Sequence, residues 1–224
     1  MEPLLNTGAR QKVPKGAVLT GYPAIAVSQR QLGDPQMFTK TIQVGEIGAS
    51  IYNCYRQILL GAKAASTPFV ACCEDDTLYV PAHFAYRPAG DVFAYNHHRW
   101  VISRRQAADG TRQAFYYYRE RTQMAMCIAP RALLVDTLEE RFAKFPDPVP
   151  HEVAKRGWGE PGRYEKNLGL TPRKLEYFRT AEPCVTFNHG ESLMGRRQVQ
   201  PTDLLRADLP PWGGADELWR RVHG

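Results

Sequence analysis

The sequence predicts an α/β protein with a mixed, mainly parallel sheet, helices on both faces and an antiparallel hairpin. Three neighbouring segments lead to this prediction. An apolar strand runs from about residue 24 to 28, a helix follows it, and the strand "FVACC" begins at residue 69. A strand, a covering helix and a second strand in this order form the unit from which parallel sheets are built.

Periodicity predicts the helix of this unit. Apolar residues recur at the spacing of one helical face, at Ile51, Tyr55, Ile58, Ala62 and Ala65. Ser50 stands where an N-cap is expected, because its hydroxyl can accept from the first free backbone N–H groups. Thr67-Pro68 ends the helix, since the residue before a proline disfavours helical geometry.

The next part of the chain predicts antiparallel strands. Residues 91–103 and 112–121 read as two strands around Asp109-Gly110, a dipeptide typical of hairpin turns. "TQMAMCIAP" reads as another strand, and its Pro130 can begin a helix that runs to about residue 145.

The remaining segments are less regular. Residues 1–20 are expected to be a loose lead-in. Residues 146–172 are rich in Gly and Pro and predict a long irregular segment, which is often functional within a domain. "LEYFRTAEPCVTFNHG" predicts two short strands that end near residue 189, and a polar, basic tail with a short terminal helix follows.

Composition narrows the class of protein. Of 224 residues, 43% are hydrophobic and 23% charged, which suits a folded domain. No apolar run approaches the roughly 20 residues that span a bilayer, and the first residues lack the apolar run of a secretory signal. We therefore expect a cytoplasmic protein with no membrane segment. The net charge of +6 favours a polyanionic partner.

The cysteines predict no disulfide framework. The five of them show no CxxC pair, so reduced and mostly buried thiols are expected. Cys72 and Cys73 alternate along a strand and should face opposite sides. A zinc site built from Cys72, Cys73, His97 and His98 is an alternative, although their spacing matches no common zinc pattern.

Two features place chemistry at the end of the strand "FVACC". Glu74, Asp75 and Asp76 follow the strand directly, and their oxygens suit Mg²⁺ or Mn²⁺. "VGEIGAS", which contains Gly45 and Gly48, precedes the helix, where backbone N–H groups can bind phosphate. A metal beside a phosphate site would bind a nucleoside diphosphate. Each feature also has a structural interpretation, as a solvated loop and as an ordinary helix start.

At these residues the sequence resembles glycosyltransferases of the GT-A fold, a Rossmann-like family. "YRQILLGAKAASTPFVACCEDDTLYVP" follows the family's order of a helix with an Arg, an apolar strand and an acidic metal motif, written DxD. The resemblance is clearest over residues 44–84 and weaker to about residue 195. Glu74-Asp75-Asp76 departs from a strict DxD, so Glu74 and Asp76 are taken as its outer positions. A shift by one residue to Asp75 stays open.

The resemblance also implies roles for individual residues. Asp76 is expected to bind Mn²⁺ or Mg²⁺ together with a late histidine, which here is His189. The family's first strand ends at the nucleotide base and ribose. The expected donor-binding residues are therefore Ser28, Gln29, Gly45, Gly48, Arg56 and Glu74, with Arg30 less firmly assigned.

What the resemblance implies is transfer of a sugar from a nucleotide donor, most often a uridine diphosphate sugar, to a hydroxyl. An inverting enzyme needs a carboxylate that accepts the hydroxyl proton. "RGWGEPGRYEKN" offers Glu160, the preferred candidate beside Trp158 and glycines, and Glu165. Asp75 is counted with Glu160 among the catalytic candidates.

The acceptor is predicted from interleaved aromatic and basic residues, which can stack on bases and contact phosphates. The chain is similar to small glycosyltransferases encoded by phages, some of which modify hydroxymethylated pyrimidines in DNA, and it would then act in the host cytoplasm. The acceptor-binding candidates are Trp100, Arg104, Arg105, Arg196 and Arg197, with Tyr116 to Tyr118 as further stacking residues.

This interpretation divides the chain into one glycosyltransferase domain over residues 1–195 and a basic extension over residues 196–224 on or near the acceptor side. Two alternatives remain. The acceptor could be a cell-surface glycan or protein. The chain could also be a non-catalytic nucleic-acid-binding domain, whose acids are only a solvated loop and whose hairpin has one packed aromatic face.

Overall fold

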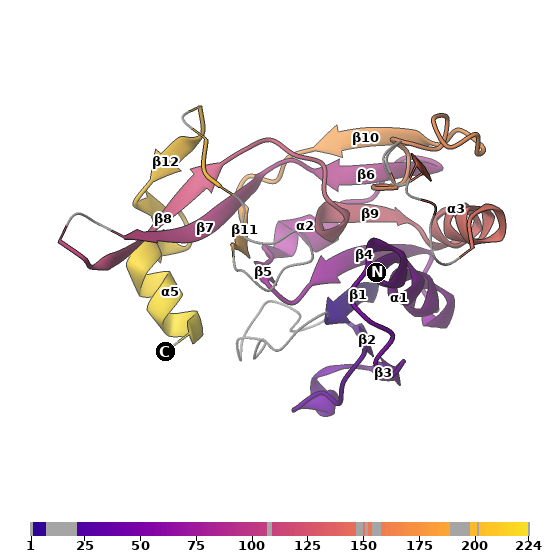
Figure 1. Cartoon of the computed structure of the whole chain (residues 1–224), viewed down its shortest axis with the longest axis horizontal. Helices are drawn as coiled ribbons and strands as arrows, with labels where there is room; N and C mark the ends of the chain where they lie inside the picture. Colours follow the sequence, from indigo (N-terminus) through magenta and orange to yellow (C-terminus); the bar gives the residue numbers. More distant parts are fainter. Residues whose placement is uncertain are drawn as a thin grey trace.

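The computed structural model describes residues 2–7, 22–106, 109–146, 150, 152–153, 158–188, 198–200 and 202–223, with the backbone alone for residues 2–7. These residues form a seven-stranded main sheet and a five-stranded second sheet, which lie side by side (Figure 1). A short two-stranded sheet, β13 (Asp208–Leu209) with β14 (Gly213–Gly214), completes the arrangement.

The main sheet is mixed and mainly parallel, as predicted. Its strands, in spatial order, are β3 (Lys40–Gln43), β2 (Ile25–Ser28), β1 (Glu2–Thr7), β4 (Phe69–Glu74), β9 (Cys127–Pro130), β6 (Val92–Asn96) and β10 (Lys174–Phe178). The first four run parallel, and β9 runs antiparallel to both of its neighbours. Since β10 is parallel to β6, only β9 opposes the common direction among the described strands.

Helices cover both faces of this sheet, which confirms the predicted fold class. Helices α1 (Ile51–Ala64) and α3 (Arg131–Lys144) pack on one face, where Tyr55 and Leu134 belong to the same buried cluster as Cys72. The short helix α2 (Pro81–Ala85) packs on the other face with Cys73. The two adjacent thiols therefore face opposite cores, as alternation along a strand requires. Helix α1 begins as predicted, because the Ser50 side chain accepts from the backbone N–H of Asn53.

The second sheet contains the predicted hairpin. Its strands, in spatial order, are β12 (Leu204–Arg206), β8 (Arg112–Tyr118), β7 (Arg99–Gln106), β11 (Cys184–Phe187) and β5 (Thr77–Leu78). Strands β7 and β8 pair antiparallel on either side of the turn with Asp109 and Gly110. Helix α5 (Ala215–His223) packs on one face, so the C-terminal residues contribute both a strand and a helix to this sheet. Two short 3₁₀ helices, η1 (Pro35–Met37) and η2 (Met124–Met126), lie in connections.

The expectation of a loose lead-in is wrong for residues 2–7. They form β1, which lies between β2 and β4 and pairs in parallel with both. The segment "EPLLNT" gives little local signal, since it holds a proline and no alternation of apolar and polar residues. Its strand conformation depends on pairing with distant neighbours. The strand that ends at Ser28 is therefore the second along the chain.

The expectation of one continuous strand over residues 91–103 is also wrong. The chain leaves the main sheet after β6 and begins β7 in the second sheet, with His97 and His98 between the strands. Asn96 explains the break, because its side-chain oxygen accepts from the backbone N–H of His98 at 2.8 Å. An asparagine side chain that bonds two residues onward offers the backbone an alternative to a continuing strand.

Candidate functional site

The acidic turn, defined as Glu74, Asp75 and Asp76, lies where the strand order of the main sheet reverses. Chain order proceeds outward from β1 through β2 to β3 on one side, and β4 lies on the other side of β1. Open α/β sheets bind ligands outside the carboxyl ends of the strands at such a reversal. The acidic turn follows the carboxyl end of β4, and all three acids are half-buried. The acidic turn is therefore a candidate ligand site.

A buried tyrosine holds the first residue of this turn. The Tyr79 hydroxyl accepts from the backbone N–H of Glu74 at 2.9 Å and donates to the carbonyl of Ala125 at 3.0 Å. Burial raises the pKa of Tyr79 well above its ordinary value, so the hydroxyl keeps the proton that it donates. The ring in turn packs against His83 and Phe84. The acidic turn therefore rests on a block of buried rings.

A chain of two threonines orients Asp76. The Thr77 hydroxyl donates to Asp76 Oδ1 at 3.0 Å, and its oxygen lies 3.0 Å from the Thr186 hydroxyl. Because Thr77 has one hydroxyl proton and gives it to the carboxylate, Thr186 is the donor in the second bond. The carbonyl of Asp76 also accepts from the backbone N–H of Phe187 at 2.8 Å. The second sheet therefore fixes both the backbone and the side chain of Asp76.

The predicted metal ligands fall partly outside the described residues. His189, Arg196 and Arg197 are not described; Asn188, the residue before His189, donates from its side chain to the Ser103 hydroxyl at 3.1 Å. No group of three metal-binding side chains occurs within the described part of the chain. Mg²⁺ and similar ions commonly use one or two protein carboxylates together with substrate phosphates. The acidic turn fits that requirement.

The glycine segment before α1 is tied to the end of β2. The Gln29 side chain accepts from the backbone N–H of Gly48 at 3.0 Å and donates to its carbonyl at 3.2 Å. Gly48 has a φ of +84°, a conformation that favours glycine. This pair of bonds, the Gln29–Gly48 clasp, uses the N–H of Gly48 within the chain. A phosphate at this segment would have to use other N–H groups, and the donor-binding roles of both residues stay predictions.

The other predicted donor residues lie near the same edge or on α1. Ser28 is buried at the end of β2, where its hydroxyl donates to the carbonyl of Arg30 at 2.7 Å. Gly45 has a φ of +73° and open space around its Cα. Arg56 is exposed on α1. Arg30 forms an exposed ion pair with Glu46, with 3.6 Å between the charged atoms.

The two candidate bases of the irregular segment differ in their surroundings. Glu160 is half-buried, 3.6 Å from Arg163, and near enough to Tyr55 and Tyr95 to raise the pKa of both hydroxyls after the larger effect of burial. Tyr95 lies near the carboxyl end of β6, which is the same edge of the sheet as the acidic turn because β4 and β6 run in one direction.

Glu165, the alternative base, is buried in the core and paired there. It is 1% exposed, forms an ion pair with the buried Arg141, and accepts from the backbone N–H of Gly162 at 2.8 Å. Buried charges are stable when they are paired in this way, so the carboxylate has a structural use.

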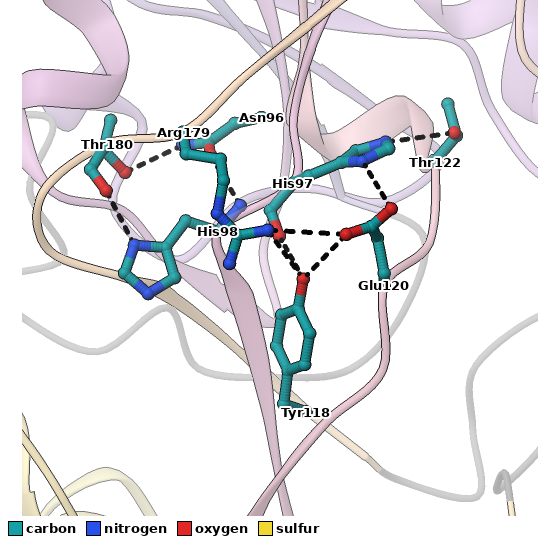
Figure 2. Close-up of polar contacts among 8 residues, drawn as sticks. All are labelled: Asn96, His97, His98, Tyr118, Glu120, Thr122, Arg179 and Thr180. Atoms are coloured by element: carbon teal, nitrogen blue, oxygen red, sulfur yellow. Dashed lines mark hydrogen bonds and ion pairs between the residues drawn. The ribbon is translucent and has the colours of Figure 1, made fainter. Parts of the chain in front are cut away.

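A polar cluster at the junction between β6 and β7 was not predicted. Figure 2 shows His97 directed toward Thr122 and Glu120, and His98 directed toward Thr180. His98 Nδ1 lies 2.7 Å from the carbonyl oxygen of Thr180, which can only accept, so Nδ1 carries a proton. Burial lowers the pKa of His97, and Glu120 opposes that effect. The repeated histidine was the only sequence signal.

The positions of these histidines also argue against the alternative zinc site. His97 and His98 are directed toward the loops at Thr122 and Thr180, whereas Cys72 and Cys73 lie in opposite cores of the main sheet. The four residues do not converge.

The predicted acceptor residues separate onto two faces of the second sheet. Trp100 is 6% exposed, with the Arg206 guanidinium 5.5 Å from its ring centre, so stacking on a base would require the ring to be uncovered. Arg104 lies over Trp219 of α5, and Arg105 is exposed. Tyr116 and Tyr117 are buried.

Comparisons with known proteins find matches to this chain among solved structures, but not among family models or curated proteins. No family model matches it, and no curated protein matches it. Among solved structures, a nucleotidyl transferase from Methanothermobacter thermautotroptrophicus matches with a TM-score of 0.40 and 16% identity, over 62% of this chain and 76% of that one. Within the described residues, every helix is too short or too polar to cross a membrane.

Proposed function

We propose that this chain is a metal-dependent glycosyltransferase that moves a sugar from a uridine diphosphate donor to a hydroxyl of a large acceptor. The supporting observation is the acidic turn at the strand-order reversal, with Asp76 oriented by Thr77 and Thr186. A carboxylate at this position would hold a divalent cation, whose charge would offset that of a nucleotide's phosphates.

The residues of the turn have separate roles in this proposal. Asp76 would hold the metal, with His189 as the second protein ligand, and Glu74 would contact the donor. When Mn²⁺ or Mg²⁺ is bound, it neutralises the charge that develops on the departing diphosphate. Asp76 is half-buried, which leaves it within reach of a bound donor while its backbone is fixed by β11.

The transfer step forms one bond and breaks one. The acceptor hydroxyl oxygen bonds to the anomeric carbon, and the bond from that carbon to the diphosphate oxygen breaks, so uridine diphosphate leaves with the electron pair. In an inverting reaction a carboxylate accepts the hydroxyl proton. Glu160 is the proposed base because it lies at the same sheet edge and is half-buried, and Asp75 is the second candidate.

The preferred acceptor is a hydroxymethylated pyrimidine in DNA. The net charge of +6 supports an acceptor that carries phosphates, and several arginines lie on the second sheet next to the acidic turn. A target base inside a duplex would have to be flipped out or presented in a single strand.

The first experiment measures release of uridine diphosphate from a panel of donor sugars with Mn²⁺ present. Asp76→Asn keeps the shape of the side chain and removes its charge, and should lower release by roughly 100-fold or more. Asp91→Asn is the matched control, because Asp91 is an exposed acid at the amino end of β6, the opposite edge of the sheet, and should change little.

Three outcomes would contradict this proposal. Full activity in excess chelator would exclude a role for the metal. Release of pyrophosphate from a nucleoside triphosphate and a sugar phosphate would indicate nucleotidyl transfer. DNA binding without turnover of any donor would favour the non-catalytic nucleic-acid-binding domain.

The acceptor is tested separately. DNA with hydroxymethylcytosine, with hydroxymethyluracil and without modification is offered with each donor, and the nucleosides are weighed by mass spectrometry. A mass increase of one sugar on a modified base is expected. Transfer to a glycan or protein, with no sugar on any DNA, would favour the alternative acceptor, a cell-surface glycan or protein.

A further inference from the structure

The hairpin of β7 and β8 extends beyond the main body of the molecule as a ribbon, with β12 along one edge and α5 beneath it (Figure 1). Side chains along such a ribbon alternate between its two faces. Ile102 and Tyr116, which are paired across the ribbon, belong to the buried cluster with Leu218 of α5. One face is therefore occupied by the chain itself.

The other side, called the open face here, comprises Arg105, Gln113 and Phe115. Arg105 pairs with Gln113 across the ribbon, and Ser103 pairs with Phe115. Arg105 and Gln113 are exposed and Phe115 is half-buried. The Arg105 guanidinium lies 5.2 Å from the centre of the Phe115 ring, a distance at which the cation and the ring attract.

A cavity of about 190 Å³ lies beside these residues. It is lined by Arg105, Gln113, Ala114, Phe115, Leu205, Arg206 and Ala207. Arg105 borders an apolar floor that includes Phe115 and Leu205, and Leu205 is 42% exposed. Arg206 pairs with Tyr116 and its guanidinium lies over Trp100, so its side chain belongs to the α5 side. The cavity is smaller than the roughly 300–1,000 Å³ of small-molecule sites, so it suits one segment of a longer ligand. Arginine beside a flat apolar surface matches a phosphate beside a sugar or base.

Three of the nearby acids are used within the chain. Asp109 accepts from both the backbone and the hydroxyl of Thr111, which lowers its pKa. Asp216 accepts from the backbone N–H of Ala114 at 2.8 Å. Asp203 pairs with Arg119. None of these three acids pairs with Arg105, whose charge favours an anionic ligand.

The open face lies on the same side of the second sheet as the threonines that support the acidic turn, and the residues between them, Ser103, Thr186 and Thr77, are buried. Val185, Phe187 and Leu78 face α5, so Thr186 and Thr77, which alternate with them, lie on the side of the open face. Phe187 pairs with Ile102, three residues before Arg105. With roughly 3.3 Å per residue and 4.8 Å between strands, the backbones of Arg105 and Asp76 are on the order of 15 Å apart. A strand of DNA covers that distance in about four or five nucleotides.

We infer that the open face binds the sugar–phosphate backbone of a nucleic acid, with Arg105 contacting a phosphate and Phe115 contacting a sugar or base. This inference rests on the proposed DNA acceptor and names the surface that holds it. It also changes the sequence-based assignment, because Trp100 and Arg104 lie on the α5 side and Phe115 takes the place of Trp100, whereas Arg105 keeps its predicted role.

The experiment measures binding of labelled single-stranded and duplex 20-mers over a range of salt concentrations. Arg105→Ala should weaken binding about five- to tenfold near 50 mM salt. It should reduce the slope of log affinity against log salt by roughly 0.7 to 0.9, the value for one lost phosphate contact. Phe115→Leu should weaken single-strand binding with no change of slope, because stacking is lost and charge is kept.

Arg112→Ala is the matched control. Arg112 is exposed in the same hairpin but alternates onto the α5 side, so the same loss of charge should leave the slope unchanged. Arg105→Lys should restore the slope. Melting curves verify that each variant is folded.

Equal effects of Arg112→Ala and Arg105→Ala would overturn the inference, as would absence of salt-dependent DNA binding by the unmodified chain. Equal or tighter binding of a sulfated oligosaccharide, with the same losses, would assign the face to a glycan. Release of uridine diphosphate by the unmodified chain is measured in parallel, so failure of this surface is distinguished from failure of the proposed activity.

Discussion

The acidic turn and the glycine segment before α1 occupy the same edge of the main sheet, but they are held differently. The acidic turn is fixed by buried groups, namely the Tyr79 hydroxyl, the Thr77–Thr186 pair and the backbone of Phe187. The glycine segment is fixed by the Gln29–Gly48 clasp, which is exposed to water, and by the side-chain amide of Asn53, which donates to the carbonyls of Ile47 and Gly48. Water competes for exposed hydrogen bonds, whereas a buried partner cannot be replaced by it. The two segments should therefore respond very differently to mutation.

The largest expected effect concerns the buried rings behind the acidic turn. Burial lowers the pKa of His83 to about 3. In the unfolded chain the histidine titrates near 6.5, so between these values the unfolded state binds a proton that the folded state does not. The free energy of unfolding should therefore decrease as the pH is lowered below 6.5. The decrease from this group is about 1.4 kcal/mol per pH unit, or roughly 3 kcal/mol at pH 4.

Urea denaturation from pH 7 to pH 4 measures this effect. His83→Gln keeps a side-chain oxygen for the Asn96 amide, which lies 3.3 Å from His83 Nδ1, and does not titrate. Its pH dependence should be flatter than that of the unmodified chain by the amount given. Parallel curves for the two proteins would show that His83 is protonated in the folded state.

The next effect separates the two segments directly. Tyr79→Phe removes the hydroxyl and leaves the N–H of Glu74 and the carbonyl of Ala125 without their buried partner. A buried polar group that loses its hydrogen bond costs about 1–3 kcal/mol, so the free energy of unfolding should fall by roughly 2–4 kcal/mol. Gln29→Ala is the comparison in the glycine segment and should cost less than about 1 kcal/mol. Similar losses for both would remove the distinction between the segments.

The smallest effect sharpens the description of Asp76. Thr77→Val removes the donor to its carboxylate at nearly constant volume, and Mn²⁺ affinity measured by electron paramagnetic resonance should fall about tenfold. Thr77→Ser keeps the hydroxyl and should retain the affinity. Thr186→Val should produce a smaller loss, because its hydroxyl acts through Thr77. Unchanged affinity in all three variants would show that the threonines stabilise the turn without orienting Asp76.

Local signals made much of the fold predictable. The helix from Ile51, its Ser50 cap and the hairpin turn at Asp109 and Gly110 depend on residues close together in the chain, and all three are confirmed. Strand β1 was missed because its pairing partners are distant and its own sequence has no alternation. The break after Asn96 depends on one side-chain hydrogen bond that leaves the hydrophobic pattern of the segment unchanged.

The candidate site was likewise predictable only in the parts that depend on residues close together in the chain. Acids directly after an apolar strand are a local pattern, so the acidic turn was found from the sequence. Its support was not, because Thr186 lies 109 residues from Thr77 and Ala125 lies 46 residues from Tyr79. The ion pair of Glu165 with Arg141 and the position of Phe115 beside Leu205 likewise depend on chain segments that only the fold brings together.

The acidic turn has one further consequence, which follows from its neighbours in the chain. β4 ends in the main sheet and β5 begins in the second sheet, so these three residues are a covalent joint between two separately built bodies. His97 and His98 form another such joint between β6 and β7. A rotation of one sheet against the other would therefore change the position of these carboxylates relative to the main sheet, and with them the proposed metal site.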